Sequence, residues 1–340
     1  MDLHDFARHI PKAELHVHLE GTVGPATLLE LARQNQVLLP VEDEAGLQRL
    51  YRFHDFRRLI QVFRLINSCL RTQDDYRLIA YAYGRECARQ NIRYAEVTVS
   101  IETNLRKSGL PWMAILEGLN AGREYARLET GVELRWIFDI VRDHPRTQDQ
   151  VLEIALAARA QGCVALGLGG SEKRYPPQLF ARVFERARQA GLPRAPHAGE
   201  LAGSKSVWGA LELLHADRLA HGVRSIEDPP LLETLRQQQI ALDICPTSNI
   251  CLGVYPSYAA HPLRQLWDAG LLITLGSDDP PLFNTDLNQE YLLLIDHFEF
   301  QVDELEQISL NGVRASFLPL ADKARLQAEF QAEFLRLREA

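Results

Sequence analysis

At 340 residues, the chain is long enough for two average domains or for one large α/β barrel. Hydrophobic residues make up 46% of it and charged residues 24%, which is ordinary for a globular protein with a sizeable core and argues against disorder. The formal net charge is -8 and the Lys and Arg residues are scattered, so we expect no nucleic-acid partner.

The sequence shows no signal for export or for a membrane. Residues 1–5 have no basic segment followed by an apolar stretch, and no apolar run reaches the roughly 18 residues of a membrane-spanning helix. The cysteines are odd in number and lack close paired spacing, so they indicate neither a disulfide framework nor a thiolate zinc site. They are Cys69, Cys87, Cys163, Cys245 and Cys251. We expect a cytoplasmic protein without a membrane partner, and the oligomeric state stays open.

Short β-branched runs alternate with helical patterns along most of the chain, which is typical of βα units around a parallel sheet. We predict strands near residues 13–18, 93–99, 133–140, 164–168, 194–197, 218–221, 241–244 and 272–275. Helical periodicity predicts helices at 27–34, 112–128, 148–161, 177–190, 206–215, 230–238, 261–269 and 287–298. Eight strands, each followed by a helix, predict an α/β fold, the (β/α)8 TIM barrel.

Two stretches go beyond the eight units. Residues 41–90 are too long for one crossover helix, so we predict a helical insertion after the first strand that covers the barrel mouth. Residues 303–317 and 322–338 predict extra amphipathic helices at the C-terminus. Because no Pro/Gly/Ser linker or repeat interrupts the sequence, we expect residues 1–340 to form a single domain.

Barrel enzymes carry their active sites at the carboxyl ends of the strands, so the polar residues at these ends are the candidates. The first strand ends in His16 and His18, which alternation within a strand points to the same face. His197 ends the fifth strand, and Asp278 follows the eighth. Three imidazoles and one carboxylate are typical of a mononuclear zinc site with an open position for water. We therefore predict one Zn²⁺ per subunit. Lys173, the nearest candidate for a carbamylated ligand to a second metal, falls in a loop.

Two more strand-end residues suit acid–base chemistry. Glu200 follows His197 on a Gly-containing turn and would hold a proton if desolvated, while His221 would orient and activate water. Each candidate also has a structural alternative. A His-x-His pair is more often hydrogen-bonded than metal-bound, Glu200 would also serve as a cap for the helix near Ser204, and His221 would also serve a neighbouring loop. Their coincidence at strand ends favours catalysis.

These residues stand in motifs that resemble the adenosine deaminase family. The motifs are Pro-Lys-Ala-Glu-Leu-His-Val-His-Leu-Glu-Gly (11–21), His-Ala-Gly-Glu (197–200), His-Gly (221–222), Cys-Pro-Thr-Ser-Asn (245–249) and Ser-Asp-Asp-Pro (277–280). They run in family order from about residue 10 to 320, and together they are highly specific. The other zinc deaminases, with His-x-Glu and Pro-Cys-x-x-Cys, are not indicated because that cysteine pair is missing.

The resemblance implies hydrolytic deamination at C6 of a 6-aminopurine nucleoside, in which zinc-activated water replaces ammonia and leaves a 6-oxopurine. It implies that Glu200 protonates N1 and that His221 orients and deprotonates the water. It also implies that Asp279 contacts N7 and that the Gly170 backbone contacts N3. The substrate partners are thus a small-molecule nucleoside and water.

Departures from the adenosine-specific pattern bear on the substrate. Position 20 is Glu where adenosine deaminases carry an Asp that reaches the ribose, and we assign Glu20 to substrate binding. The segments at 167–170, 245–249 and 278–291 are most similar to aminodeoxyfutalosine deaminases of menaquinone biosynthesis. Their substrate is an adenine nucleoside with a bulky 5′ aryl extension, for which Phe53 and Phe56 of the insertion would supply contacts. These aromatics would alternatively pack the insertion's own core.

Other activities stay open. Adenosine and free adenine are the alternative substrates, the latter in purine salvage. A non-purine hydrolase of amides or phosphoesters would share the His-x-His start but not the pairing of His-Ala-Gly-Glu with Asp-Asp-Pro. A purine sensor with structural zinc is disfavoured by the open coordination position, because structural zinc sites are closed.

Overall fold

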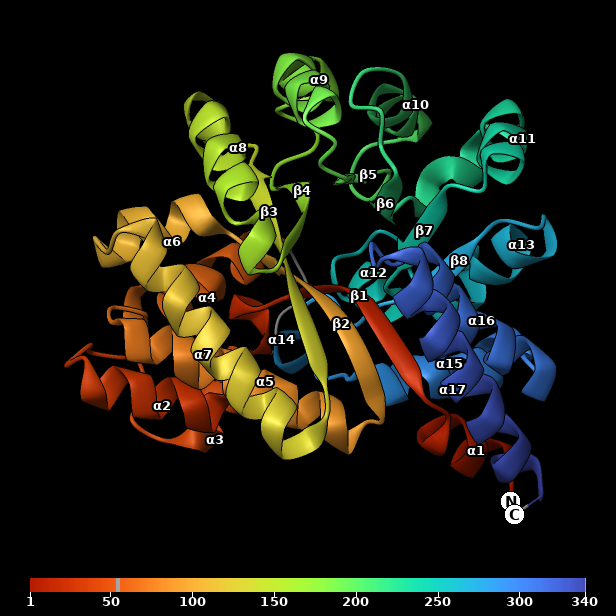
Figure 1. The fold of residues 1–340 in the computed structure, drawn as a ribbon, viewed down its shortest axis with the longest axis horizontal. Helices are drawn as coiled ribbons and strands as arrows, with labels where there is room; N and C mark the ends of the chain where they lie inside the picture. The colour runs from red at the N-terminus through yellow and green to blue at the C-terminus, as the bar shows by residue number, and fades with distance from the viewer. Residues whose placement is uncertain (53–55, 340) are drawn as a thin grey trace.

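A computed structural model describes residues 1–52 and 56–339. Eight parallel strands form one sheet in which each strand pairs with the next along the chain. They are β1 (Lys12–His18), β2 (Ile92–Val99), β3 (Glu133–Val141), β4 (Cys163–Gly169), β5 (Arg194–Ala198), β6 (Arg218–His221), β7 (Ala241–Ile244) and β8 (Ile273–Leu275). The sheet curls into a nearly closed barrel with helices around it (Figure 1). The predicted (β/α)8 barrel is confirmed.

Most helices follow the strands as the periodicity predicts. The helices after the barrel strands are α2 (Pro25–Gln34), α6 (Ile101–Ser108), α7 (Trp112–Thr130), α8 (Gln148–Ala157), α9 (Ala181–Gln189), α10 (Ser204–Glu212), α11 (Pro229–Gln238), α12 (Pro246–Cys251), α13 (Leu263–Asp268), α14 (Pro280–Phe283) and α15 (Leu287–Phe298). The chain begins with α1 (Leu3–His9) and ends with α16 (Val302–Ala315) and α17 (Leu320–Glu339). None of the described helices combines the length and hydropathy that crossing a bilayer requires.

The first and last strands close the barrel through the backbone of Asp278. Val17 and Asp278 form a parallel bridge. The His18 N–H donates to the Asp278 carbonyl at 2.9 Å, and the Asp278 N–H donates to the His16 carbonyl at 3.2 Å. A Cβ at Gly276 would lie 2.5 Å from the His16 carbonyl oxygen, so the two backbones approach too closely for a side chain there. We call this contact between β1 and residues 276–278 the seam.

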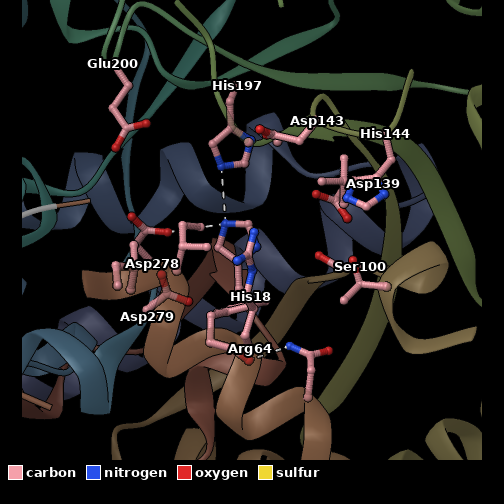
Figure 2. A pocket seen from close by; sticks show the side chains of 18 of the residues that line it. His18, Arg64, Ser100, Asp139, Asp143, His144, His197, Glu200, Asp278 and Asp279 are labelled. Atoms are coloured by element: carbon pink, nitrogen blue, oxygen red, sulfur yellow. Dashed lines mark hydrogen bonds and ion pairs between the residues drawn. The ribbon is translucent and has the colours of Figure 1, made fainter. Parts of the chain in front are cut away.

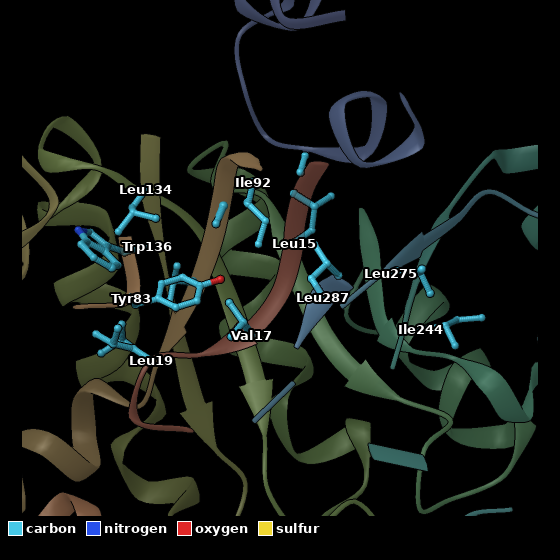
Figure 3. Close-up of a cluster of buried hydrophobic side chains, with 14 of the residues drawn as sticks. Leu15, Val17, Leu19, Tyr83, Ile92, Leu134, Trp136, Ile244, Leu275 and Leu287 are labelled. Atoms are coloured by element: carbon cyan, nitrogen blue, oxygen red, sulfur yellow. The ribbon is translucent and has the colours of Figure 1, made fainter. Parts of the chain in front are cut away.

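Strand β1 shows how alternation sets the position of the site. Leu15 and Val17 are buried in the layer between the sheet and the helices, where Figure 3 shows them near Ile92. His16 and His18 alternate with these two residues along the strand. Their side chains therefore lie on the opposite face, toward the barrel interior. A register shift between Glu14 and Val17 marks a bulge in β1, a feature that often re-aims side chains beside active sites.

The chain between β1 and β2 is helical, as predicted. After α2 it forms α3 (Glu44–Leu50), α4 (Phe56–Cys69) and α5 (Gln73–Arg89). Helix α5 packs along α7, where Gly118 and Gly122 allow close contact because a Cβ at either would lie 2.3 Å from a carbonyl oxygen of α5. Side chains of α4 line a cavity at the carboxyl ends of the strands, so this helix covers part of the barrel mouth.

Helix α15 holds the loop after β7 through a buried carboxyl. Glu290 is fully buried and accepts hydrogen bonds from the Thr247 N–H at 3.1 Å and the Thr285 hydroxyl at 2.5 Å. Burial raises the pKa of Glu290 to about 7, although the two threonines oppose the rise. Glu290 therefore binds a proton in the folded protein at pH values where it is already ionised in the unfolded chain.

This raised pKa predicts a specific pH dependence of stability. Between about pH 4.5 and 7 the folded state binds more protons at Glu290 than the unfolded state, so stability falls as pH rises through this window, by at most about 3 kcal/mol. We expect Glu290→Gln to remove this loss, so the Tm of the variant relative to wild type is higher at pH 8 than at pH 5. Glu117→Gln, at an exposed helical position, is the control and should show a constant difference. An equally constant difference for Glu290→Gln would contradict the assignment.

Candidate active site

Four side chains converge at the carboxyl end of the barrel. His16 and His18 come from β1, His197 comes from β5, and Asp278 follows β8. One donor atom from each lies within 4.8 Å of all the others. The two imidazole nitrogens His18 Nε2 and His197 Nε2 are 3.2 Å apart, and Asp278 Oδ1 lies 3.3 Å from His18 Nε2 (Figure 2). The structure thus brings together the four residues that the sequence predicts as ligands.

The donor set fits a cation. His16 Nε2 is buried without a hydrogen-bond partner among the described residues, and it lies 3.4 Å from Asp278 Oδ1. Burial lowers the pKa of His18 to about 4, and burial together with the neighbouring histidines holds the pKa of His197 well below its usual range. Both rings are therefore neutral at pH 7, which is the form of imidazole that binds a metal.

Asp278 is held ionised and in a strained conformation. Burial opposes its ionisation, but the neighbouring imidazoles, His16 first among them, outweigh burial and hold the pKa of Asp278 well below its usual range. The Ser248 hydroxyl donates to Oδ2 at 2.6 Å and fixes the carboxylate from behind. Asp278 has a φ of 62°, in the left-handed region that residues other than glycine rarely adopt, and such strain is typical of functional sites.

Glu200 and His221 face one another beside this cluster. His221 Nε2 lies 3.7 Å from Glu200 Oε1 and 3.9 Å from Asp278 Oδ2. Burial, with the charge of Asp278 second, raises the pKa of Glu200 well above its usual range, whereas burial lowers the pKa of His221 to about 3. The opposite directions of these two pKa shifts favour a protonated Glu200 beside a neutral His221, which separates an acid from a base.

The structural alternatives for these two residues find no support. Helix α10 is capped at Gly203 without a side-chain hydrogen bond, so Glu200 does not cap it. His221 Nδ1 has no partner within the described chain, and the backbone φ of His221 is 65°. The left-handed backbone turns this side chain toward the cluster at a cost in strain.

Asp279 occupies space that a glycine provides. It is buried, its Oδ1 has no hydrogen-bond partner among the described residues, and burial with the neighbouring acids raises its pKa well above the usual range. A Cβ at Gly21 would lie 1.8 Å from Asp279 Oδ1. The glycine that follows Glu20 therefore sets where the Asp279 carboxyl lies.

Two buried charged residues support the site, and the sequence alone assigned neither of them a role. Glu172 accepts hydrogen bonds from four consecutive backbone N–H groups, of residues 199–202, at 2.6–3.2 Å. Arg142 donates to the His197 carbonyl at 2.7 Å and the Tyr175 carbonyl at 2.6 Å. They fix the backbone on which His197 and Glu200 stand.

Glu20 differs from its expected setting. Its carboxyl is fully buried, and Oε1 accepts from the Ser100 N–H at 3.1 Å and the Asn104 amide at 2.5 Å. Glu20 is absent from the described residues that line the adjoining cavity. The carboxyl therefore braces the start of α6, and its predicted contact with substrate stays a prediction.

The cavity itself has a volume of about 410 Å³ and runs from His18, His197 and Asp278 to α4 and α6. Gly170 lines it, with a φ of 98° that favours glycine. Phe53 and the side chain of Phe56 lie outside the described part of the chain, so their predicted contacts are not tested. Phe63, further along α4, lines the cavity and meets the His18 ring edge-on at 6.4 Å between centroids. Its position on a helix without a chemical motif gave no signal in the sequence.

A second set of donors overlaps the first. His16, His221, Cys245 and Asp278 also offer atoms within 4.8 Å of one another. Burial raises the pKa of the Cys245 thiol well above its usual range, and its Sγ donates to the Asp243 carbonyl at 3.8 Å. The four-residue set with His18 and His197 needs no such deprotonation. Lys173 is exposed, away from both sets.

A parallel barrel with neutral imidazoles and an ionised carboxylate at the carboxyl ends of its strands has the architecture of metal-dependent barrel hydrolases. Comparison with known proteins narrows this class. The profile of the adenosine deaminase family matches residues 11–333. The chain therefore belongs to the adenosine deaminase family, and it is an aminohydrolase.

Individual relatives agree with this assignment. An aminodeoxyfutalosine deaminase of Streptomyces avermitilis is 40% identical over 332 residues, which are 96% of this chain and 92% of that protein. An adenine deaminase of Cupriavidus necator is 37% identical over 323 residues, 95% of this chain and 92% of that protein. The crystal structure of an adenine deaminase from Arthrobacter aurescens superposes with a TM-score of 0.90 at 31% identity, covering 97% of this chain and all of that one. An amidohydrolase from Burkholderia ambifaria with bound zinc gives a TM-score of 0.91 at 29% identity, covering 99% and 93% of the two chains.

The contact between Gly21 and Asp279 predicts the effect of a single methyl group. We expect Gly21→Ala to displace the Asp279 carboxyl and to lower kcat for deamination by about 100-fold, the typical consequence of misplacing a group by about 1 Å. Gly24→Ala is the matched control, because a Cβ there meets nothing within 4 Å. The measurement is steady-state deamination together with Tm for both variants. Equal kcat in the two variants would show that Gly21 does not set the position of Asp279.

Proposed function

We propose that the protein is a zinc-dependent hydrolytic deaminase that converts a 6-aminopurine nucleoside to the 6-oxopurine and ammonia, with aminodeoxyfutalosine as its substrate. The observation that carries the proposal is the buried Glu200 carboxyl 3.7 Å from His221, beside the cluster of three imidazoles with Asp278. Hydrolytic deamination requires these elements, because a ring nitrogen must gain a proton while water is deprotonated.

Each group of the site has a role in this reaction. His16, His18, His197 and Asp278 would hold zinc, which when bound supplies the Lewis acidity that makes water a nucleophile near neutral pH. Glu200 carries the proton for N1, and His221 orients the water and accepts its proton.

Two further groups orient the purine. Asp279 contacts N7, and its raised pKa favours the protonated form that would donate to this ring nitrogen. The backbone of Gly170 contacts N3 at the cavity wall.

The cavity favours a substrate larger than a free base. Its volume of about 410 Å³ falls in the range of roughly 300–1,000 Å³ typical of sites for drug-sized ligands. Beside the donor cluster it is also lined by Phe63 and Arg64 of α4 and by Arg106 and Lys107 of α6. Cations and an aromatic ring suit an aryl extension, through stacking and cation–π contacts. The 40% identity to an aminodeoxyfutalosine deaminase supports the same substrate and hence a place in menaquinone biosynthesis.

Free adenine is the second candidate substrate. The relatives named adenine deaminase, at 36–37% identity, are almost as similar to this chain as the aminodeoxyfutalosine deaminases. Adenosine is a third possibility within the same chemistry. These substrates share the purine end of the site and differ in what fills the outer cavity.

Metal removal tests the ligand assignment without reference to activity. We expect one zinc per chain by elemental analysis, and a chelator should lower Tm by several degrees because the metal binds only the folded state. His197→Asn should lose the zinc and the Tm response to chelation, whereas Cys245→Ser should keep both. Loss of zinc in Cys245→Ser but not in His197→Asn would instead assign the site to the overlapping set that contains His221 and Cys245.

The substrate assignment is tested by kcat/KM for aminodeoxyfutalosine, adenosine and adenine, followed by the change in purine absorbance. We expect the first to be preferred by at least about tenfold, because only it fills the outer cavity. Glu200→Gln, with zinc retained, should lower kcat by about 10²–10⁴-fold and so shows that the turnover belongs to this site. Preference for adenine would support purine salvage, and turnover of none of the three would contradict the purine chemistry.

A further inference from the structure

Asp139 on β3 is a buried acid that the reaction does not use. It is 2% exposed, lines the cavity, and its Oδ1 has no hydrogen-bond partner among the described residues. Figure 2 shows it with Ser100 on one side of the cavity, while Glu200, Asp278 and Asp279 lie on the other. An unpaired buried carboxyl costs free energy unless something binds it. Its position suggests that a ligand supplies the missing partner.

The neighbouring strand β4 has glycines at the positions where side chains would crowd this carboxyl. Asp139 pairs with Gly167 of β4, and Gly169 follows on the same face of that strand. A Cβ at Gly167 would lie 3.0 Å from Asp139 Cβ, and one at Gly169 would lie 2.8 Å from Asp139 Oδ2. A side chain at either position would therefore press on Asp139 and displace it. Glycine within a strand commonly marks close approach by another group or a ligand.

Asp139 lies between the two ends of the cavity. The Cβ position of Gly169 that is 2.8 Å from Asp139 Oδ2 is also 3.9 Å from His197 Nδ1. Figure 2 shows Ser100, which directly precedes α6, next to Asp139. A substrate whose base reacts at the donor cluster and whose extension reaches α6 therefore passes Asp139 with the part in between.

In a nucleoside with a 5′ extension, the group between the base and the extension is the sugar. Its hydroxyl groups both donate and accept hydrogen bonds, so they suit a carboxyl in either protonation state. Glu20 is less suited to this contact, because it is absent from the described residues that line the cavity and its Oε1 is already bound by Ser100 and Asn104. Asp139 does line the cavity, and a rotation of its carboxyl would present the buried, unpartnered Oδ1 to a hydroxyl group there.

We propose that Asp139 binds a hydroxyl group of the substrate's sugar and thereby selects nucleosides over free bases. The inference rests on the proposed function in one respect, that the substrate is a nucleoside. It assigns a specificity role to a residue outside all the motifs, and it gives the glycines at 167 and 169 a function as the floor of the sugar site.

This role is tested by measuring kcat/KM for substrates that lack one sugar hydroxyl, in wild type and in variants at position 139. The substrates are adenosine, 2′-deoxyadenosine, 3′-deoxyadenosine and adenine, and the proteins are wild type, Asp139→Ala and Asp139→Asn. For wild type, we expect loss of one of the two hydroxyl groups from the substrate to lower kcat/KM by about 10- to 100-fold. For Asp139→Ala, the same loss should lower kcat/KM by less than about threefold, because the carboxyl that binds the hydroxyl is already missing. Adenine turnover should differ between the two proteins by less than about threefold. Asp139→Asn, which keeps an acceptor oxygen, should fall between them.

The controls separate this role from others. Asp143→Asn changes a carboxylate that also lines the cavity but already accepts from the Ser171 N–H at 2.9 Å, so it should affect all three nucleosides by the same factor. Zinc content and Tm are measured for every variant. An equal loss on all four substrates in Asp139→Ala, or loss of zinc, would overturn the sugar role and indicate that Asp139 orients His197 instead.

The outcomes also distinguish this inference from the proposed function. If wild type prefers adenine but still shows the hydroxyl dependence that Asp139→Ala abolishes, the proposed substrate and the selection of nucleosides over free bases are both wrong, and only the sugar contact stands. If nucleosides are preferred and the Asp139→Ala loss is uniform, the sugar contact is wrong and the proposed function stands. If wild type turns over no nucleoside, both are wrong.

Discussion

The seam between the first and last strands is the contact on which the site depends. The backbone of Asp278 pairs with His16 and His18, and its side chain faces the same two imidazoles. Closing the barrel and assembling three of the four donor residues are thus one structural event. The close approach at Gly276 and the left-handed backbone of Asp278 are local costs of this arrangement, which the hydrogen bonds of a complete barrel offset.

The surroundings of the seam separate charge in a way that favours deamination. Burial favours the neutral forms of His18, His197 and His221 and the protonated forms of Glu200 and Asp279, while the neighbouring imidazoles favour the ionised form of Asp278. The same low-polarity environment therefore affects acids and bases in opposite directions, because burial disfavours the charged form of each. Water-filled surroundings would leave these acids and bases too similar to ordinary side chains for proton transfer in a defined direction.

Much of the fold was predictable because burial leaves a periodic signal. All eight strands lie within a residue or two of the predicted apolar runs, and the predicted helices recur, with 148–161 and 177–190 each including a short 3₁₀ turn. The helices α1, α6, α12 and α14 were missed. Three of them have four to seven residues and α6 has eight, too few for helical periodicity to stand out.

The candidate site was predictable only where chemistry coincides with a strand end. His16, His18, His197 and Asp278 met this condition, and the structure brings them together. The residues that hold them did not. Glu172 follows β4, and Arg142 lies at the end of β3, but their partners are 27–30 and 33–55 residues away, on other parts of the chain. A single sequence gives no periodic or spacing signal for such contacts, because they arise from how strands and loops meet in three dimensions.

The seam also limits when the protein can work. Residues 17 and 278 are joined there, so nearly the whole chain must be synthesised before the donor set exists. An emerging chain that has folded only β1 to β7 already contains all three imidazoles. His16 and His18 then lie at an open edge of the barrel, without the carboxylate of Asp278. Contacts this distant in sequence form late and slowly during folding. Binding of a metal by this donor set would therefore require completion of the barrel, and a chain that ends before residue 278 would lack the complete set.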